Sequence, residues 1–185
     1  MHRSLRALLA GALLFAAAIP CAAQGRVAFV RWTYNPDDTL RSSTLYRVNA
    51  DGTGFMQLAP ATANVYRFDP QWSPSGNTIA YQYQAGPSAM GQIWRMSATG
   101  TNRTRISFGT RNHEWPTWRP DGGMLMFVTH LYATGAHCLA IVRPDGTGQR
   151  NLFCPPAPTF IDYRPRWSAD GSRIFVATNL RGSGL

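Results

Sequence analysis

The sequence contains no lysine. All 18 of its basic residues are arginine, against nine acidic residues, so the formal net charge is +9 and the isoelectric point is near 10.3. Every positive charge is therefore a guanidinium group, which forms forked contacts with carboxylates and phosphates and stacks on aromatic rings. This composition favours acidic partners such as anionic glycans, lipid headgroups, acidic proteins or nucleic acid. A coding bias towards arginine explains the same composition without any such partner.

Other absences narrow the class of protein. Only 15% of the residues are charged and glycine has no three-residue period, which excludes a coiled coil and collagen. Beyond the N-terminus no segment has a convincing helical period, and none approaches the 18 apolar residues of a membrane span. The 185 residues are 44% apolar and include 17 glycines and 13 prolines. They predict one turn-rich, all-β domain with a sizeable core.

The first 23 residues have the pattern of a signal peptide. Arg3 and Arg6 precede an apolar run at 7–19, and small residues follow it, with cleavage expected after Ala23. The mature chain would keep 16 arginines against nine acids, a net charge of +7. Export predicts a periplasmic or secreted protein with no membrane span, and it argues against a nucleic-acid partner.

Two short motifs recur with a period of about 47 residues. The first is a tryptophan turn, as in Pro-Gln-Trp-Ser-Pro-Ser-Gly at 70–76, and it recurs at 116–122 and 165–171. Its repeated residues are Trp72, Trp118 and Trp167, and Gly76, Gly122 and Gly171. The second motif is an Asp-Gly-Thr-Gly turn or a variant of it, at 49–54, 97–102 and 143–148. Two interleaved motifs in one period indicate a structural repeat, with the tryptophans packed between the repeats.

Strand-like runs flank both motifs. They follow the tryptophan turns at 78–83, 124–129 and 173–178, with a matching run at 26–31, and they precede the Asp-Gly turns at 45–48, 93–96 and 139–142. Four such strands in each period are typical of a β-propeller blade. Residues 26–181 resemble the TolB-type, WD-like propeller repeat. The resemblance implies a propeller domain over residues 24–185. Counted from residue 26, the expected strands number thirteen, which make about three and a quarter blades. Because such propellers close with six or more blades, the sequence is expected to be truncated at its C-terminus, or to form an open arc.

Candidate binding residues directly precede each expected inner strand. The candidates occupy equivalent positions in three repeats. In a propeller these positions would surround one mouth of the central channel. The candidates are Arg67, Asp69, His113, Glu114, Trp115, Tyr163 and Arg164. Such a ring can bind carboxylates or sugars through ion pairs and stacking. Alternatively these residues hold the blades together, with Arg67 paired to Glu114 or Arg164 to Asp162.

No catalytic or metal site is predicted. The histidines lack a short ligand spacing and an acidic cluster, so neither a metal nor another cofactor is expected. No Gly-x-Ser-x-Gly sequence occurs, so a hydrolase site is not expected in these residues.

Cys138 and Cys154 remain after removal of the signal peptide. They lie at equal distances from Gly146, at the centre of a predicted hairpin, so they should face one another within reach of a disulfide. Export to an oxidising compartment favours this bridge. The alternative is two buried thiols.

Three functions remain open at this stage. The first is a non-catalytic, exported binding module for envelope or extracellular proteins or for anionic glycans. The second is the regulatory propeller of a prolyl-oligopeptidase-like serine peptidase whose catalytic domain follows. The third is a propeller lyase that acts on acidic polysaccharide.

Overall fold

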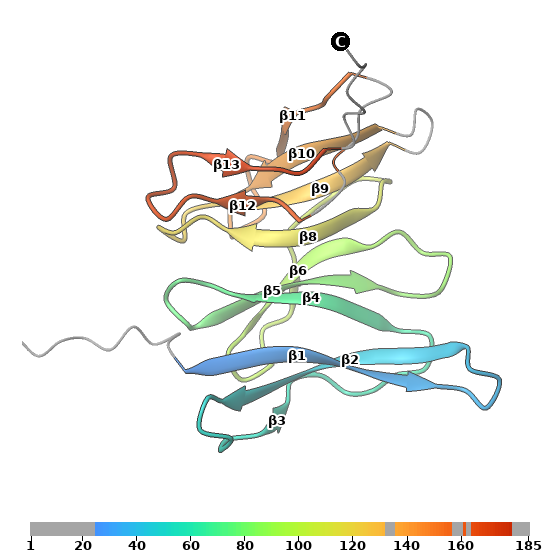
Figure 1. Ribbon diagram of the computed structural model, residues 1–185. Coiled ribbons are helices and arrows are strands. Elements are labelled where there is room, and N and C mark those ends of the chain that lie inside the picture. The colour runs from blue at the N-terminus through green and yellow to red at the C-terminus, as the bar shows by residue number, and fades with distance from the viewer. Residues whose placement is uncertain (1–24, 132–135, 157–160, 162–163, 179–185) are drawn as a thin grey trace, which may run out of the picture.

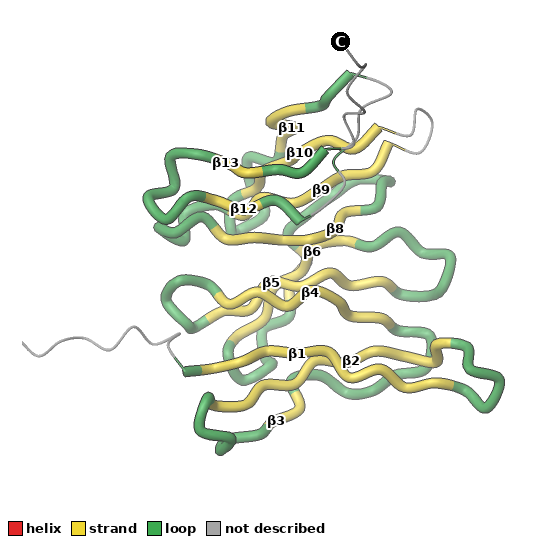
Figure 2. The backbone as a smooth tube through the Cα atoms, viewed as in Figure 1, coloured by secondary structure: helices red, strands yellow, loops and turns green. Residues whose placement is uncertain are grey.

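The computed structural model describes residues 25–131, 136–156, 161 and 164–178. In this part of the chain the regular elements are all β-strands, with no helix (Figures 1 and 2). The strands are β1 (Arg26–Tyr34), β2 (Leu40–Asn49), β3 (Met56–Gln57), β4 (Tyr66–Trp72), β5 (Thr78–Gln84), β6 (Gln92–Ser97), β7 (Thr104–Arg105), β8 (His113–Trp118), β9 (Leu125–Leu131), β10 (Ala136–Val142), β11 (Arg150–Phe153), β12 (Arg166–Trp167) and β13 (Ile174–Phe175). The all-β prediction and its thirteen strands are confirmed. The predicted signal peptide lies outside the described residues.

The strands form antiparallel sheets that follow chain order. Strands β1-β2-β3 make blade 1, β4-β5-β6-β7 make blade 2, β8-β9-β10-β11 make blade 3, and β12-β13 begin blade 4. Figure 1 shows these sheets stacked one on the next along the chain. Strands β4, β8 and β12 are the first, or inner, strands of their sheets. Blade 1 starts instead with β1, which matches β5, so among the described residues it has no inner strand.

The Asp-Gly turns are closed by side-chain hydrogen bonds. Asp51 Oδ1 accepts bonds from the backbone N–H of Thr53 (2.9 Å) and from its hydroxyl (2.7 Å), and the third turn repeats both bonds. The second turn has Thr99 in place of the aspartate. There Ser97 Oγ accepts the backbone N–H groups of Thr99 (3.3 Å) and Thr101 (3.1 Å). A hydroxyl therefore replaces the carboxylate, which explains why the repeat tolerates this substitution.

The tryptophan turns share one backbone geometry. Gly76, Gly122 and Gly171 have φ values of 70°, 74° and 69°. Each donates its N–H to the carbonyl three residues earlier, at 2.9 Å. A side chain would strain the backbone at this left-handed position, which is why glycine recurs there.

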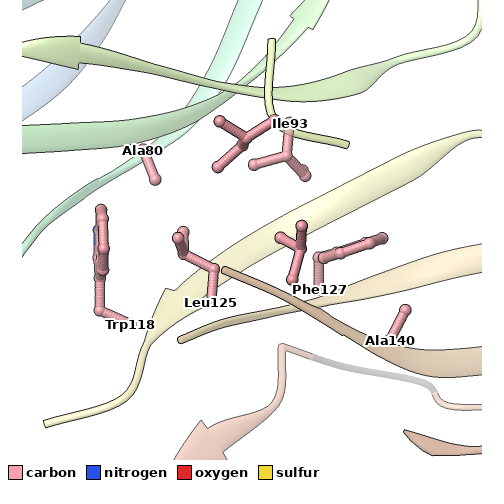
Figure 3. Close-up of a cluster of buried hydrophobic side chains, with 8 residues drawn as sticks. Ala80, Ile93, Trp118, Leu125, Phe127 and Ala140 are labelled. Atoms are coloured by element: carbon pink, nitrogen blue, oxygen red, sulfur yellow. The ribbon is translucent and has the colours of Figure 1, made fainter. Parts of the chain in front are cut away.

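The core lies between the blades. One cluster joins blades 2 and 3, and Figure 3 shows its side chains pointing towards one another from both sheets. Its members are Ala80, Ile93, Ile106, Trp118, Leu125, Phe127, Ala140 and Val142. Trp72 packs in the same way between blades 1 and 2, and Trp167 packs against the cluster of blade 3. The prediction that the repeated tryptophans pack between blades is confirmed.

The predicted disulfide is present. Cys138 and Cys154 are bonded, with their Cα atoms 4.2 Å apart. Strands β10 and β11 change register between Leu139 and Ala140, and beyond that point Leu139 faces Phe153. The irregularity shifts the pairing by one residue, so that the next pair outward is the two cysteines.

Candidate functional site

Asp69 and Trp115 occupy matching places in the inner strands β4 and β8, each directly before a proline. Both have left-handed backbone angles, with φ of 51° and 56°, and the pairing of each strand with its neighbour shifts register there. The candidates were expected to precede the inner strands, which is wrong for those in β4 and β8. Because proline has no N–H to donate, a bulge at this point lets the strand pass through the proline without losing its pairing. Each strand therefore begins before the proline rather than after it.

Asp69 forms an ion pair with Arg164, which lies just before β12. Arg164 Nη2 donates to Asp69 Oδ1. The Asp69 side chain is 13% exposed and that of Arg164 is 41% exposed. Burial raises the pKa of Asp69 and nearby Glu114 adds to the rise, while Arg164 opposes it. This contact therefore joins the inner parts of blades 2 and 4.

Glu114 is the only glutamate in the sequence, and it lies in β8. It accepts a hydrogen bond from the Asn112 side-chain amide, and its Oε2 lies 3.0 Å from Nε2 of His130. Burial alone would raise the pKa of Glu114. The bonds from His130 and Asn112 and the charge of His130 outweigh burial, so the pKa is lowered.

Two histidines complete the group of polar residues. His130 in β9 and His137 in β10 are cross-strand partners, with ring centroids 4.1 Å apart. His137 Nδ1 lies 2.8 Å from the carbonyl oxygen of Ile161. We call Asp69, Asn112, Glu114, His130, His137 and Arg164 the inner-strand cluster.

Arg67 and His113 do not join this cluster. Arg67 is 6% exposed, lies over the ring of Tyr83 at 5.5 Å and donates to the carbonyl of Pro60 (3.3 Å). His113 is 3% exposed, and its Nδ1 lies 2.8 Å from Ser107 Oγ. Both side chains lie in contacts between elements rather than beside Asp69.

The ion pairs differ from those expected from the sequence. Glu114 pairs with His130 rather than with Arg67, and Arg164 pairs with Asp69. Asp162 and Tyr163 lie outside the described residues. Trp115 is partly buried and packs against the core of blade 3.

Sequence reasoning missed three aromatic residues, one of which directly precedes Asp69 of the cluster in β4. Trp32 and Tyr34 are 50% and 52% exposed, and their rings stack with centroids 6.4 Å apart. Trp32 also meets the ring of Phe68 edge-on at 5.8 Å, and Phe68 directly precedes Asp69. We call Trp32, Tyr34 and Phe68 the aromatic platform. The sequence feature that could have revealed the platform is the alternation of aromatic and polar residues in Trp-Thr-Tyr at 32–34. It was missed because the first strand was expected to end at residue 31.

The described residues contain no group of three or more His, Cys, Asp or Glu side chains placed to hold a metal ion. Within the same residues no helix is long and apolar enough to cross a membrane.

Solved structures decide the fold. The chain matches TolB from Acinetobacter baumannii with a TM-score of 0.67 and 21% identity, over 90% of this chain and 39% of that one. The fold is a TolB-like β-propeller. It also matches the β-propeller domain of the Trilobed protease from Pyrococcus furiosus, with a TM-score of 0.55 and 17% identity, over 75% of this chain and 42% of that chain.

Sequence comparison adds a curated relative. No family model matches this TolB-like propeller. It is 30% identical over 123 residues to the uncharacterized peptidase YuxL of Bacillus subtilis. The aligned residues cover 64% of this chain and 18% of the relative. The chain thus spans less than a fifth of the curated relative it matches.

Proposed function

We propose that this chain is the propeller module of an exported protein, and that it binds envelope or extracellular proteins or anionic glycans without catalysing a reaction on them. The binding surface is the aromatic platform together with the inner-strand cluster. The observation that carries the proposal is the exposed, stacked pair Trp32 and Tyr34 next to Phe68, whose neighbour Asp69 belongs to the cluster.

The chemistry of this surface suits a partner that is both ring-bearing or apolar and negatively charged. Exposed aromatic rings that are already stacked offer contact area at little conformational cost. The arginine charge adds a long-range attraction for anions. The Cys138–Cys154 bridge supports a periplasmic or secreted location, because disulfides persist in oxidising compartments.

Dextran sulfate and uncharged dextran test this function as a matched pair of probes. We expect saturable binding of dextran sulfate that weakens as salt rises, because salt screens exposed charges. The double variant Trp32→Ala/Tyr34→Ala should weaken it about tenfold or more. Phe153→Ala is the matched control, since Phe153 is exposed but lies on the outer strand β11. Equal binding of both polymers, no effect of the double variant, or cleavage of either polymer would contradict the proposal.

A second candidate is the propeller of a serine peptidase, and the peptidase named as the curated relative favours it. The natural reading frame then continues past Leu185 into a catalytic domain. Sequencing the adjoining DNA tests this directly. A Gly-x-Ser-x-Gly sequence downstream, followed by an aspartate and a histidine, would support the peptidase; a stop codon at that point would refute it.

A further inference from the structure

A cavity of about 240 Å³ lies between blades 2 and 3, separate from the inner-strand cluster. One wall is the segment after β7, with Phe108 and Arg111. The other wall is the side of blade 3 that faces blade 2, with His113, Thr129 and Asn151. We call it the interblade pocket.

Thr129 lines this pocket and carries a buried hydroxyl. The residue is 3% exposed, and Thr129 Oγ1 has no hydrogen-bond partner among the described residues. Buried polar groups in proteins are nearly always bonded to protein, water or ligand. A molecule in the pocket can supply the partner that the protein does not.

His113 is held in place beside that hydroxyl. Its Nδ1 lies 2.8 Å from Ser107 Oγ, which in turn lies 3.2 Å from Gln92 Oε1 and accepts the N–H of Ile93 at 2.8 Å. Burial, with the charges of Arg105, Arg111 and His130, lowers the pKa of His113 to about 4. The imidazole is therefore neutral at pH 7.

The charge around the pocket is positive. Arg111 lines it, and the guanidinium of Arg105 lies 5.2 Å from the ring of Phe108, another lining residue. The residues that line the pocket in the described structure include no aspartate or glutamate. A volume of about 240 Å³ suits a small molecule rather than a polymer.

We propose that the interblade pocket binds a small organic carboxylate, with the carboxylate group paired to Arg111 and a polar atom bonded to Thr129 Oγ1. The site does not depend on the proposed binding of partners at the aromatic platform. It is defined by one unpartnered buried hydroxyl, one guanidinium and one apolar ring in a cavity of matching size.

Three carboxylates and their neutral amides test the proposal by calorimetric titration of the disulfide-bonded protein: acetate, succinate and benzoate against acetamide, succinamide and benzamide. We expect at least one carboxylate to bind and its amide to bind at least tenfold more weakly. Arg111→Gln should weaken binding at least tenfold, because it removes the paired charge. Arg150→Gln is the matched control, since Arg150 is exposed on β11 and does not line the pocket.

Thr129→Val removes the hydroxyl at nearly constant volume, and we expect it to weaken binding severalfold while Thr129→Ser restores it. Melting curves check that each variant is folded. The double variant Trp32→Ala/Tyr34→Ala should leave carboxylate binding unchanged, so failure at one surface is distinguishable from failure at the other. Absence of saturable binding for all three carboxylates would show that the pocket holds only water. Equal binding of the amides, or full binding by Arg111→Gln, would show that Arg111 does not pair with a carboxylate. Each of these outcomes would overturn the proposal.

Discussion

His113 lies in an inner strand, yet its imidazole is enclosed between blades 2 and 3. The ring lies 4.8 Å from that of Phe127, in the core cluster, and is 3% exposed. The unfolded chain offers the same imidazole to water, where its pKa is near 6.5. Folding therefore favours the neutral form of this one side chain.

We expect the free energy of unfolding to fall as the pH drops from about 6.5 to about 4. In that window the unfolded state binds a proton at residue 113 and the folded state does not, so the contribution is complete above the window and lost below it. The loss should be up to roughly 3 kcal/mol, at 1.36 kcal/mol per pKa unit. Urea titrations across this range measure it. His113→Gln is the control, and an equally steep pH dependence in that variant would contradict the assignment.

For single residues, the sequence predicted which repeat positions carry the polar candidates better than it predicted the contacts of their side chains. Matching positions in three repeats identified Asp69, Glu114 and Arg164, and the structure brings these together. It could not show that Arg67 and His113 turn away, because successive residues of a strand point to opposite faces and a bulge resets that alternation. The bulge depends on backbone angles that no spacing rule reveals.

Among the elements, the inner strands carry the tryptophans that join neighbouring blades. Trp118 is 9% exposed, and its Nε1 donates to the carbonyl of Gln71 at 3.1 Å. Trp167 occupies the matching place in β12 but is only partly buried. The motif tryptophan is therefore more fully buried at the junction of blades 2 and 3 than at the junction of blades 3 and 4.

Trp118→Ala should lower the free energy of unfolding by roughly 3–5 kcal/mol, as is usual when a large buried aromatic ring is removed. Trp167→Ala should cost clearly less, since less of its ring leaves water on folding. Midpoints of urea unfolding compare the two variants. A larger loss for Trp167→Ala would mean that blade 4 contributes more to stability than its burial indicates.

The Cys138–Cys154 bridge closes the β10–β11 hairpin. By the chain-entropy model a loop of about 15 residues gains about 3 kcal/mol from closure, so reduction or the double variant Cys138→Ser/Cys154→Ser should lower stability by up to that amount. A thiol count on denatured, unreduced protein checks the bond. One free thiol, Cys21, is expected in the full chain and none after cleavage at Ala23. Two more free thiols than this would show that Cys138 and Cys154 are not bonded.

The order of the elements was predictable because turn chemistry repeats. Proline, aspartate and glycine at fixed offsets marked the hairpins, and the strands between them followed. Lengths were less predictable. Strand β1 continues to Tyr34, since pairing with β2 extends beyond its apolar part, whereas β3 and β7 have two residues each. Polar strand ends carry no apolar period, so their bounds depend on the neighbouring strand.

At the scale of the molecule, the first three blades differ in how far the face turned towards the preceding blade is buried. Val27, Ile79 and Leu125 occupy equivalent places, each paired with the residue just before an Asp-Gly turn motif. Ile79 and Leu125 are 0% exposed because the preceding blade covers them, whereas Val27 is 51% exposed. On blade 4, within the described part of the chain, Phe175 lies on the opposite face and is 60% exposed.

We expect the isolated chain to associate with a second copy through these two faces, because association would remove the exposed side chains of Val27 and Phe175 from water. Sedimentation velocity over a range of concentrations measures this. Val27→Asp and Phe175→Asp should each reduce the associated fraction. Met90→Asp, at an exposed position between β5 and β6, serves as a comparison for the added charge. A chain that stays monomeric at every concentration would refute the expectation.

The two open faces are unlike one another, and this fixes the symmetry of any such assembly. A face that fits a different face on the next copy gives a heterologous, head-to-tail contact rather than a paired, self-complementary one. Successive copies are then related by one repeated rotation. If that rotation divides a full turn evenly the result is a closed ring, and if it does not the copies continue into an open helical filament. In an assembly of this chain alone, the rotation between successive copies therefore decides between a finite particle and a fibre.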